Sequence, residues 1–294
     1  MGFTNRKGVA AKLNKIIVLI MTLAVVFVMT DISGIKASAL VSSRVAVPKF
    51  SAEQTFDTPY THPYNRQIDT IVLHWNKTSG ANRYQVYIQG GNYKNWTRYC
   101  TTTLNTVTVK NLTRATAYQF KIRAIYSGNT YSSFSPVQKI STARMNYDKG
   151  GWEAMCRIVY HEVGRINDDM WDKPIVYVAD CVANRYVCAK YTNDPLWAPY
   201  YKNYSNIQSI IYQSGGFMSD AGLSRDGCNY VNVPQKVKLA VWGAVYALPS
   251  YKGIANDYDV FYWCNRSYYT SSSKIAYSFK IPWGYFSIWR SYWG

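Results

Sequence analysis

Glutamate and histidine are the residues that this chain has least of. Its 294 residues include three glutamates and three histidines, against 33 lysines and arginines. Residues 150–294 contain a single histidine, His161. A zinc amidase of the usual kind needs two histidines and a third ligand, so this half of the chain lacks the residues for one. Because no Cys-x-x-Cys or Cys/His cluster is present either, we expect no metal and no cofactor.

Other catalytic motifs are missing as well. The chain has no Gly-x-Ser-x-Gly motif and no phosphate-binding loop. A Cys–His peptidase needs a histidine that faces a cysteine at the start of a helix, whereas His161 is expected in the middle of one. Carboxylate chemistry remains, and sugar cleavage is its commonest single-glutamate form outside the cell.

Apolar runs long enough to cross a membrane are absent after residue 39. The one long run, Ile16–Met29, follows a basic front of four lysines and arginines and precedes the small residues Ala37-Ser-Ala39. This pattern predicts a secretory signal peptide over residues 1–39, with an uncleaved anchor as the alternative. The mature protein would then be secreted.

Acidic residues are scarce mainly in the front half. Residues 40–149 carry 14 lysines and arginines against 4 acidic residues, whereas residues 150–294 carry 14 against 11. A basic front half on an exported protein predicts an anionic partner, either an anionic cell-wall polymer or a membrane surface. No nucleic acid is expected outside the cell. The alternative is that the charge serves solubility alone.

All six cysteines lie in the predicted mature part, where disulfides are permitted. Cys228 with Cys264 is one possible pair, and Cys156 with Cys181 or Cys188 is another. Cys181 and Cys188 share a face of a predicted helix but lie about 10 Å apart along its axis, too far to bond each other.

The front of the chain is predicted to be all-β. Residues 40–59 suggest a linker or a first edge strand. Residues 60–143 contain short alternating segments bounded by turn residues, which predict a β-sandwich. The expected strands are 71–75, 84–88, 107–109 and 118–124.

This region resembles a fibronectin type III module over about 85 residues. Trp75 stands where such modules place a core tryptophan, and Gly80–Tyr87 is similar to the opening of their third strand. Residues Leu112–Tyr118 are similar to the family's corner motif, with Arg114 in place of a proline. The resemblance implies that the Tyr118 hydroxyl bonds back to the backbone.

Aromatic and basic residues alternate in one segment of the same module. Two interpretations of this alternation stay open: a surface patch that binds a sugar or a polymer, and ordinary strand positions. The residues concerned are Tyr93, Lys94, Trp96, Arg98 and Tyr99. His74, beside Trp75, is expected to be a surface-facing strand residue.

The back of the chain is predicted to be α+β. Residues 144–150 suggest a linker, and residues 151–294 a second domain. Apolar periodicity and cap residues predict helices over 152–164, 174–191, 206–213 and 234–248, followed by aromatic strands at 259–263, 275–279 and 285–289. Asp172 and the Ser205-Asn-Ile-Gln208 box are the expected caps.

Glu162 ends an apolar stripe on the first predicted helix. Met155, Ile158 and Val159 share its face at helical spacing. Burial raises the pKa of a carboxyl group, which suits a general acid near neutral pH. Two alternatives stay open: Glu162 pairs with Arg157 or Arg185, or the stripe ends at the surface and Glu162 is solvated.

Four segments, in the right order, resemble the cell wall hydrolase family of spore-cortex-lytic enzymes. Residues 153–162 are similar to that family's first helix, which ends in its catalytic glutamate. Ala179–Arg185, residues 206–217 and Asp259–Asn265 are similar to its later motifs, and residues 281–289 match more loosely. The chain departs from the family in three ways: Gly216 replaces a glutamine, the second glutamate after Glu162 is missing, and the last strand lacks a histidine.

The resemblance implies a lysozyme-like or transglycosylase-like domain that cleaves the glycan strand of peptidoglycan as a lytic transglycosylase. Glu162 would be its acid and base, and the wall of the substrate groove would be formed by Asn184, Arg185, Phe217, Tyr262 and Asn265. A hydrolytic muramidase is the first alternative. The second is a non-catalytic wall-binding or adhesion protein.

Overall fold

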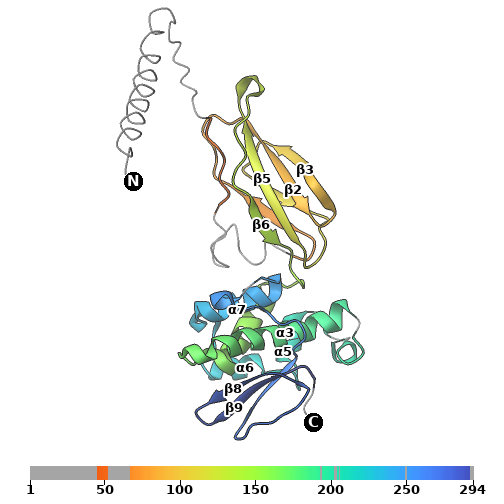
Figure 1. Cartoon of the computed structure of the whole chain (residues 1–294), viewed down its shortest axis with the longest axis vertical. Helices are drawn as coiled ribbons and strands as arrows, with labels where there is room; N and C mark the ends of the chain where they lie inside the picture. The colour runs from red at the N-terminus through yellow and green to blue at the C-terminus, as the bar shows by residue number, and fades with distance from the viewer. Residues whose placement is uncertain are drawn as a thin grey trace, which may run out of the picture. The chain divides into compact units, whose positions relative to one another are not determined.

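The computed structural model describes residues 45–51, 67–192, 194–201, 204, 206–248 and 250–291 (Figure 1). The predicted signal peptide and most of the predicted linker at 40–59 lie outside the described residues. Within the described ranges, no helix combines the length and the apolar composition that crossing a bilayer requires.

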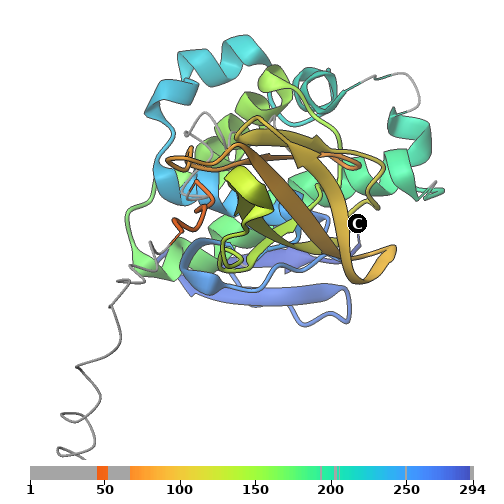
Figure 2. The same ribbon diagram turned by 90° about the horizontal axis from the view of Figure 1, so that it is seen from above.

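The front module is a sandwich of two antiparallel sheets, seen from above in Figure 2. Strand β1 (Ile71–His74) pairs with β4 (Thr106–Val109). The second sheet has the order β3-β2-β5-β6 and is formed by β2 (Arg83–Gly90), β3 (Tyr93–Thr102), β5 (Ala117–Ile125) and β6 (Gln138–Ser141). A 3₁₀ turn, Ser127–Asn129, follows β5.

Alternation decides which side of each strand is buried. In β5, Tyr118, Phe120 and Ile122 are buried, and the residues between them are partly exposed. At the edge of the sandwich, Phe50 forms an isolated antiparallel β-bridge with Trp75. Of the two expectations for residues 40–59, a linker or a first edge strand, the described part fits the edge strand. Strands β3 and β6 were not predicted, because β3 has no fully buried residue and therefore no alternation to detect.

The predicted fibronectin type III sandwich is confirmed. Trp75 is fully buried in its core. The backbone amide of Thr113 donates a hydrogen bond of 2.8 Å to the Tyr118 hydroxyl, which is the expected tyrosine corner. Arg114 therefore replaces the usual proline without loss of the corner.

The back module is α+β, as predicted. Its helices are α2 (Lys149–Val159), α3 (Asp172–Tyr191), α4 (Ala198–Tyr201), α5 (Ile207–Tyr212), α6 (Asp220–Arg225) and α7 (Gln235–Tyr246), with 3₁₀ turns at Asp169–Trp171, Tyr230–Asn232 and Tyr251–Gly253 and a π-helical turn at Tyr160–Gly164. An antiparallel sheet in the order β7-β9-β8 is formed by β7 (Tyr262–Arg266), β8 (Ile275–Ile281) and β9 (Gly284–Trp289).

Two predicted helix caps differ from the observed ones. Asp172 is the first residue of α3 rather than its cap, and its carboxylate lies 2.8 Å from the ammonium group of Lys252. Asn206 caps α5 by accepting a hydrogen bond from the Ser209 amide, while the predicted cap Ser205 lies outside the described residues. Both differences are of one position. The cap position of α3 is Trp171, whose side chain makes no capping hydrogen bond.

The predicted linker at 144–150 is packed rather than exposed. Met145 and Tyr147 belong to the same buried cluster as the helices, and Lys149 and Gly150 already lie in α2. The Arg144 amide donates a 2.7 Å hydrogen bond to the Val245 carbonyl of α7. This short run has too few apolar residues for its sequence to indicate burial.

The disulfides considered from the sequence are not formed. Cys228 and Cys264 are both free thiols. Cys181 and Cys188 are free as well, so neither is bonded to Cys156. Cys264 faces Ser287 across the β7–β9 pair, whereas Cys228 lies beside His161 and Arg165.

Candidate functional site

Glu162 lies in a π-helical turn that continues α2. Met155, Ile158 and Val159 are buried as predicted, but Glu162 itself is only half-buried. Residues Tyr160–Gly164 wind more widely than an α-helix, which turns the carboxylate from the core towards the surface. Such turns occur frequently at functional sites.

Gly164 is required where the π turn meets α7. A Cβ atom at this position would lie 2.5 Å from the Val237 Cγ2 atom. Val237 is fully buried, so it has little room to move. The absence of a side chain at Gly164 therefore fixes how closely the turn carrying Glu162 packs on α7.

Trp263 of β7 holds the Glu162 carboxylate. Its indole Nε1–H donates a hydrogen bond of 3.0 Å to Glu162 Oε2. The indole is itself stacked on Phe217, with ring centroids 5.7 Å apart and an interplanar angle of 10°. The sequence indicated Trp263 only as part of an aromatic strand, because nothing local links it to Glu162.

Four aromatic rings surround the Arg185 guanidinium group. Its Cζ atom lies 4.7 Å from the ring centroids of Phe217 and Tyr262, and within 5.5 Å of those of Trp197 and Trp263. Its Nε donates a 2.6 Å hydrogen bond to the Phe261 carbonyl. We call these four rings with Arg185 the aromatic cage. Three residues predicted for the groove wall thus meet beside Glu162: Arg185, Phe217 and Tyr262.

The other two predicted site residues lie elsewhere. Asn184 is fully buried, and its side-chain amide donates hydrogen bonds to the carbonyls of Asp257 (3.0 Å) and Val260 (2.9 Å). Its Oδ1 accepts a 2.8 Å hydrogen bond from Arg144. Asn184 therefore anchors the loop before β7 instead of facing solvent. Asn265 is an exposed residue of β7.

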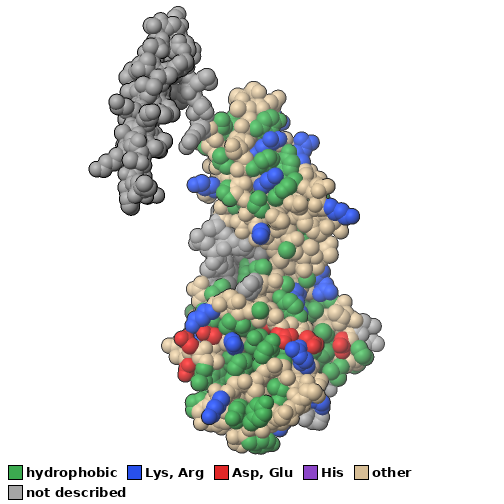
Figure 3. All heavy atoms as spheres, in the orientation of Figure 1, with side chains coloured by type: hydrophobic (Ala, Val, Ile, Leu, Met, Phe, Trp, Pro, Cys, Tyr) green, Lys and Arg blue, Asp and Glu red, His purple; other side chains and the backbone are tan. Residues whose placement is uncertain are grey.

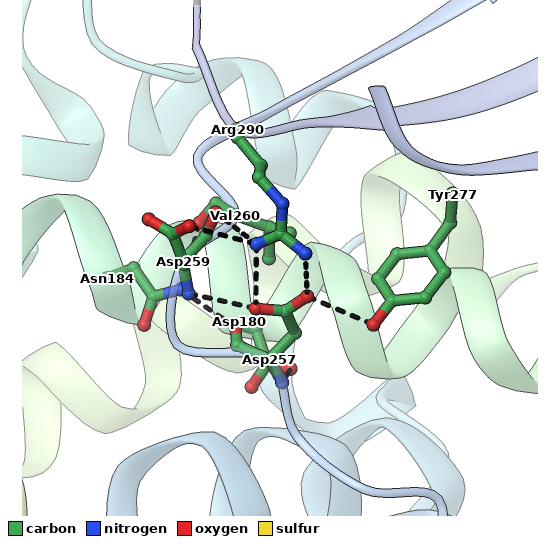
Figure 4. Close-up of polar contacts among 7 residues, drawn as sticks. All are labelled: Asp180, Asn184, Asp257, Asp259, Val260, Tyr277 and Arg290. Atoms are coloured by element: carbon green, nitrogen blue, oxygen red, sulfur yellow. Dashed lines mark hydrogen bonds and ion pairs between the residues drawn. The ribbon is translucent and has the colours of Figure 1, made fainter. Parts of the chain in front are cut away.

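The loop before β7 is clamped to α3 and to the end of β9 by a polar network (Figure 4). Buried Asp180 of α3 accepts hydrogen bonds from the Asn256 side chain (2.7 Å) and the Asp257 amide (2.8 Å). Asp257 accepts hydrogen bonds of 3.0 Å from the Tyr277 hydroxyl and 3.1 Å from Arg290. Since β7 follows directly, this network positions Trp263.

The pKa values of the two carboxyl groups in this network, Asp180 and Asp257, are shifted in opposite directions. Burial raises the pKa of Asp180 to about 7, although its hydrogen bonds from Asp257 and Asn256 oppose the shift. Burial also acts to raise the pKa of Asp257, but the Asp259 amide, Arg290 and Tyr277 outweigh it, and the pKa of Asp257 is lowered. Asp180 is thus an acid that can be neutral near pH 7 within the fold.

The alternative partner Arg157 is engaged elsewhere. It donates to the Asp220 carboxylate, to the Tyr212 hydroxyl at 2.8 Å and to the Ser224 hydroxyl at 2.9 Å. The Glu162–Arg157 pair, which the sequence left open as an alternative, is therefore not formed.

A histidine, a cysteine and an aspartate meet next to Glu162. His161 Nδ1 lies 3.5 Å from Asp226 Oδ2 and 3.9 Å from Cys228 Sγ. Arg165 donates a 2.8 Å hydrogen bond to the same sulfur. The cysteine and the aspartate approach the same ring nitrogen, and Cys228 is fully buried. This is not the Cys–His–acid relay of a peptidase, in which the base lies between its two partners.

No protein-family model matches the chain, and no curated protein matches it. Solved structures similar to it include a Fn3-like protein from Clostridium thermocellum, with 22% identity over 36% of this chain and 96% of that one and a TM-score of 0.25. The fibronectin type III domain of human fibronectin type III domain containing protein 3 has 24% identity over 33% of this chain and 82% of that one, with a TM-score of 0.25.

The chain is also similar to the twitchin kinase region from C. elegans, with 16% identity and a TM-score of 0.24. It spans 14% of the length of that structure, and the match covers 26% of this chain. Likenesses with TM-scores this low carry no argument by themselves. The assignment of the front module rests on the strand order and the tyrosine corner.

Proposed function

We propose that the protein cleaves the glycan strand of peptidoglycan as an exported lytic transglycosylase, and that Glu162 is its acid and base. The observation that carries this proposal is the Glu162 carboxylate, half-exposed on a π turn and held by the Trp263 N–H beside the aromatic cage. The proposed domain is lysozyme-like in the sense that a glutamate at a helix end faces a small antiparallel sheet.

One carboxyl group is sufficient for the proposed reaction. Protonated Glu162 gives its proton to the glycosidic oxygen as the bond from that oxygen to the anomeric carbon breaks. The muramoyl 6-hydroxyl then bonds to the anomeric carbon and loses its proton to the Glu162 carboxylate, which restores the acid. The products are a free sugar hydroxyl on one side and a 1,6-anhydro ring on the other, with no water consumed.

The neighbours of Glu162 support these steps. The Trp263 N–H bonds Oε2 and stabilises the carboxylate after it has given up its proton, while Oε1 remains available for transfer. Trp197 of the aromatic cage is buried, whereas Phe217, Tyr262 and Trp263 are partly exposed. We propose that the exposed parts of these three rings, beside the faces that contact Arg185, offer apolar surface to sugar residues. Arg185, fixed among them, places a positive charge where anionic or amide substituents of the substrate could bind.

One observation favours a hydrolytic muramidase as the second candidate. Inverting hydrolysis requires a further carboxylate that activates water. Asp226 Oδ2 lies 3.5 Å from His161 Nδ1, and His161 is the residue before Glu162, so Asp226 is the candidate for this second carboxylate. Reducing muramic ends that carry oxygen from labelled water would establish this candidate and exclude the transglycosylase.

Replacing Glu162 by glutamine tests the acid role. We expect Glu162→Gln to lower lysis of purified sacculi by about 10²- to 10⁴-fold, because general acid catalysis is lost, with unchanged thermal unfolding. The products of the wild-type enzyme should end in 1,6-anhydro-muramic acid when analysed by mass spectrometry.

Glu153→Gln is a matched control on the same helix. Glu153 forms a 3.8 Å ion pair with Lys149 on the helix surface, and such exposed pairs contribute little to stability. The Glu153→Gln variant should lyse sacculi as the wild type does. Retention of more than about a tenth of wild-type lysis by Glu162→Gln would remove Glu162 from the acid role. Absence of lysis by the wild-type protein itself would favour a non-catalytic wall-binding protein.

A further inference from the structure

The four-stranded sheet of the front module contains no acidic residue. Strands β2, β3, β5 and β6 together carry six lysines and arginines and neither aspartate nor glutamate. On the face of the molecule shown in Figure 3, acidic side chains appear over the back module and not over the sandwich. Within residues 67–143 the only acidic residue is Asp69, which precedes the other sheet.

Strand register gathers four of these cations on the outer side of the sheet. In β5, Lys121 and Arg123 alternate with buried residues and so point away from the core. Tyr87 of β2 lies opposite both Lys121 and Arg98, and Gln119 of β5 lies opposite Lys139. Neighbouring strands are about 4.8 Å apart, and alternate residues of a strand about 6.8 Å.

We call this outer surface, with Arg98, Lys121, Arg123 and Lys139, the basic face. It overlaps the segment of β3 for which the sequence left two readings open, a patch that binds a sugar or polymer and ordinary strand positions. Trp96 and Arg98 of that patch belong to the basic face. Tyr93 and Tyr99 instead pack against the core of the sandwich, and the Tyr99 hydroxyl accepts a 3.1 Å hydrogen bond from the Lys110 amide.

Aromatic rings hold the two central cations in place. Lys121 Nζ lies 4.1 Å from the centroid of Trp96 and 4.5 Å from that of Phe134. Arg123 Cζ lies 4.2 Å from the centroid of Tyr131. These contacts fix the positions of the positive charges before any partner binds, which lowers the entropy lost on binding.

The charges of the basic face are not neutralised within the fold. Every ion pair found among the described residues lies between residues 149 and 290, so none involves the four cations of the basic face. Arg123 is bonded to neutral groups, donating a 2.8 Å hydrogen bond to Gln85. Two fixed cations, flanked by the exposed cations Arg98 and Lys139 and without an ion pair among the described residues, favour a partner that carries repeated negative charges.

We propose that the basic face binds a linear cell-wall polymer that carries a phosphate group in each repeat. The cations form a band across four strands rather than converging on one point, which suits a chain and not a small anion. Guanidinium groups match phosphate oxygens with paired hydrogen bonds. Single-stranded nucleic acid is disfavoured, because bases need open aromatic faces for stacking, whereas Lys121 and Arg123 cover the rings here.

The test uses the full chain and a purified polymer of glycerol phosphate, with binding measured calorimetrically at low and at physiological salt. The double variant Arg98→Gln/Lys139→Gln removes two exposed charges of the basic face. The matched control, Lys77→Gln/Lys110→Gln, removes two exposed charges elsewhere in the same module. We expect the first variant to bind about tenfold or more weakly and the control to change less than about twofold, with wild-type affinity falling as salt rises.

Three results would overturn the proposal: no binding by the wild-type chain, equal losses in the two double variants, or tighter binding to oligothymidylate or to anionic lipid vesicles than to the phosphate polymer. The outcome is independent of the proposed catalytic activity. Glu162→Gln should bind the polymer as the wild type does, and the basic-face variant should still cleave soluble glycan strands. Failure of one proposal therefore leaves the other standing.

Discussion

At the residue scale, the catalytic proposal depends on one indole N–H. Trp263 is the partner that fixes the Glu162 carboxylate, and Phe217 fixes the indole in turn. A hydrogen bond to a charged group contributes about 1.5–3 kcal/mol. If the bond is strongest when Glu162 is ionised in the transition state, its loss should affect turnover rather than substrate binding.

Trp263→Phe should therefore lower kcat by roughly ten- to a hundredfold, with KM little changed. The ring stack on Phe217 is retained, so the fold should be stable. Steady-state kinetics on soluble glycan strands measure both constants.

Phe217→Leu provides the contrast, because it keeps the N–H donor and removes a ring of the aromatic cage. It should act mainly on KM. If both variants change kcat and KM in the same proportions, the indole N–H has no special role.

The sequence predicted part of this site and could not predict the rest. Glu162, Arg185, Phe217 and Tyr262 were predicted as site residues, and the structure brings them close together. Trp263 was missed because its bond to Glu162 spans 101 positions, and no local periodicity encodes such a contact. Asn184 was expected in the wall of the groove. Helix α3 is buried on nearly all sides, so it has no clear polar face from which periodicity could show where Asn184 points.

At the scale of elements, the position of β7 depends on the network between α3 and the loop at residues 256–260. Asp180 is fully buried, and its pKa is raised to about 7. In the unfolded chain an aspartate ionises near pH 4, so between about pH 4 and pH 7 the folded state binds one more proton than the unfolded state. The contribution of Asp180 to stability therefore falls as the pH rises through this range, and is constant above it.

Asp180→Asn removes this titration. We expect the free energy of unfolding of the variant, relative to wild type, to rise between about pH 4 and pH 7, by up to a few kcal/mol. The variant is less stable than the wild type if the NH₂ group of the new amide faces the Asp257 N–H, because two donors then meet. The informative quantity is therefore how the difference in unfolding free energy between variant and wild type changes with pH. Urea unfolding at several pH values measures it. A difference that is flat from pH 4 to pH 8 would show that Asp180 is ionised throughout.

Elements with strong periodicity were predictable, and elements shaped by long-range contacts were not. Helices α2, α3 and α7 have apolar positions at helical spacing, and each was located to within a few residues. The short helices α4 and α6, of four and six residues, were missed, whereas α5, also of six residues, was located from its capping-box pattern. The π turn after α2 was predicted as ordinary helix, because its residues continue the apolar stripe of α2 and nothing in their spacing indicates the wider winding.

At the scale of the whole molecule, each module has its own buried core. The sequence predicted this division because the hydrophobic period changes from two to 3.6 near residue 144. It predicted a linker between the modules, whereas Ala143, Met145 and Tyr147 are buried among the helices. Short connecting segments have no repeated pattern, and only their tertiary contacts show that they are packed.

The uneven charge predicts that one chain responds to salt in two ways. Lysis of walls that carry the phosphate polymer should weaken as salt rises, because charges more than about 8 Å apart are screened at physiological ionic strength. Cleavage of soluble glycan strands, which needs only the back module's site, should change little. Rates on native walls, on walls stripped of the polymer and on soluble strands separate these effects. If the cleavage rate depends on salt equally for all three substrates, the basic face has no role in wall lysis.

The π turn at Tyr160–Gly164 has a consequence for how this protein can vary. An α-helix advances 100° per residue. Deleting one residue from the π turn would therefore restore α-helical winding and rotate the side chains that follow the deletion about the helix axis. Point changes leave the spacing intact, and the carboxylate of Glu162 still reaches Trp263. Single-residue deletions and insertions here should therefore be far more harmful than most exchanges of one amino acid for another, and lineages that keep the activity should conserve the length of this segment more strictly than its composition.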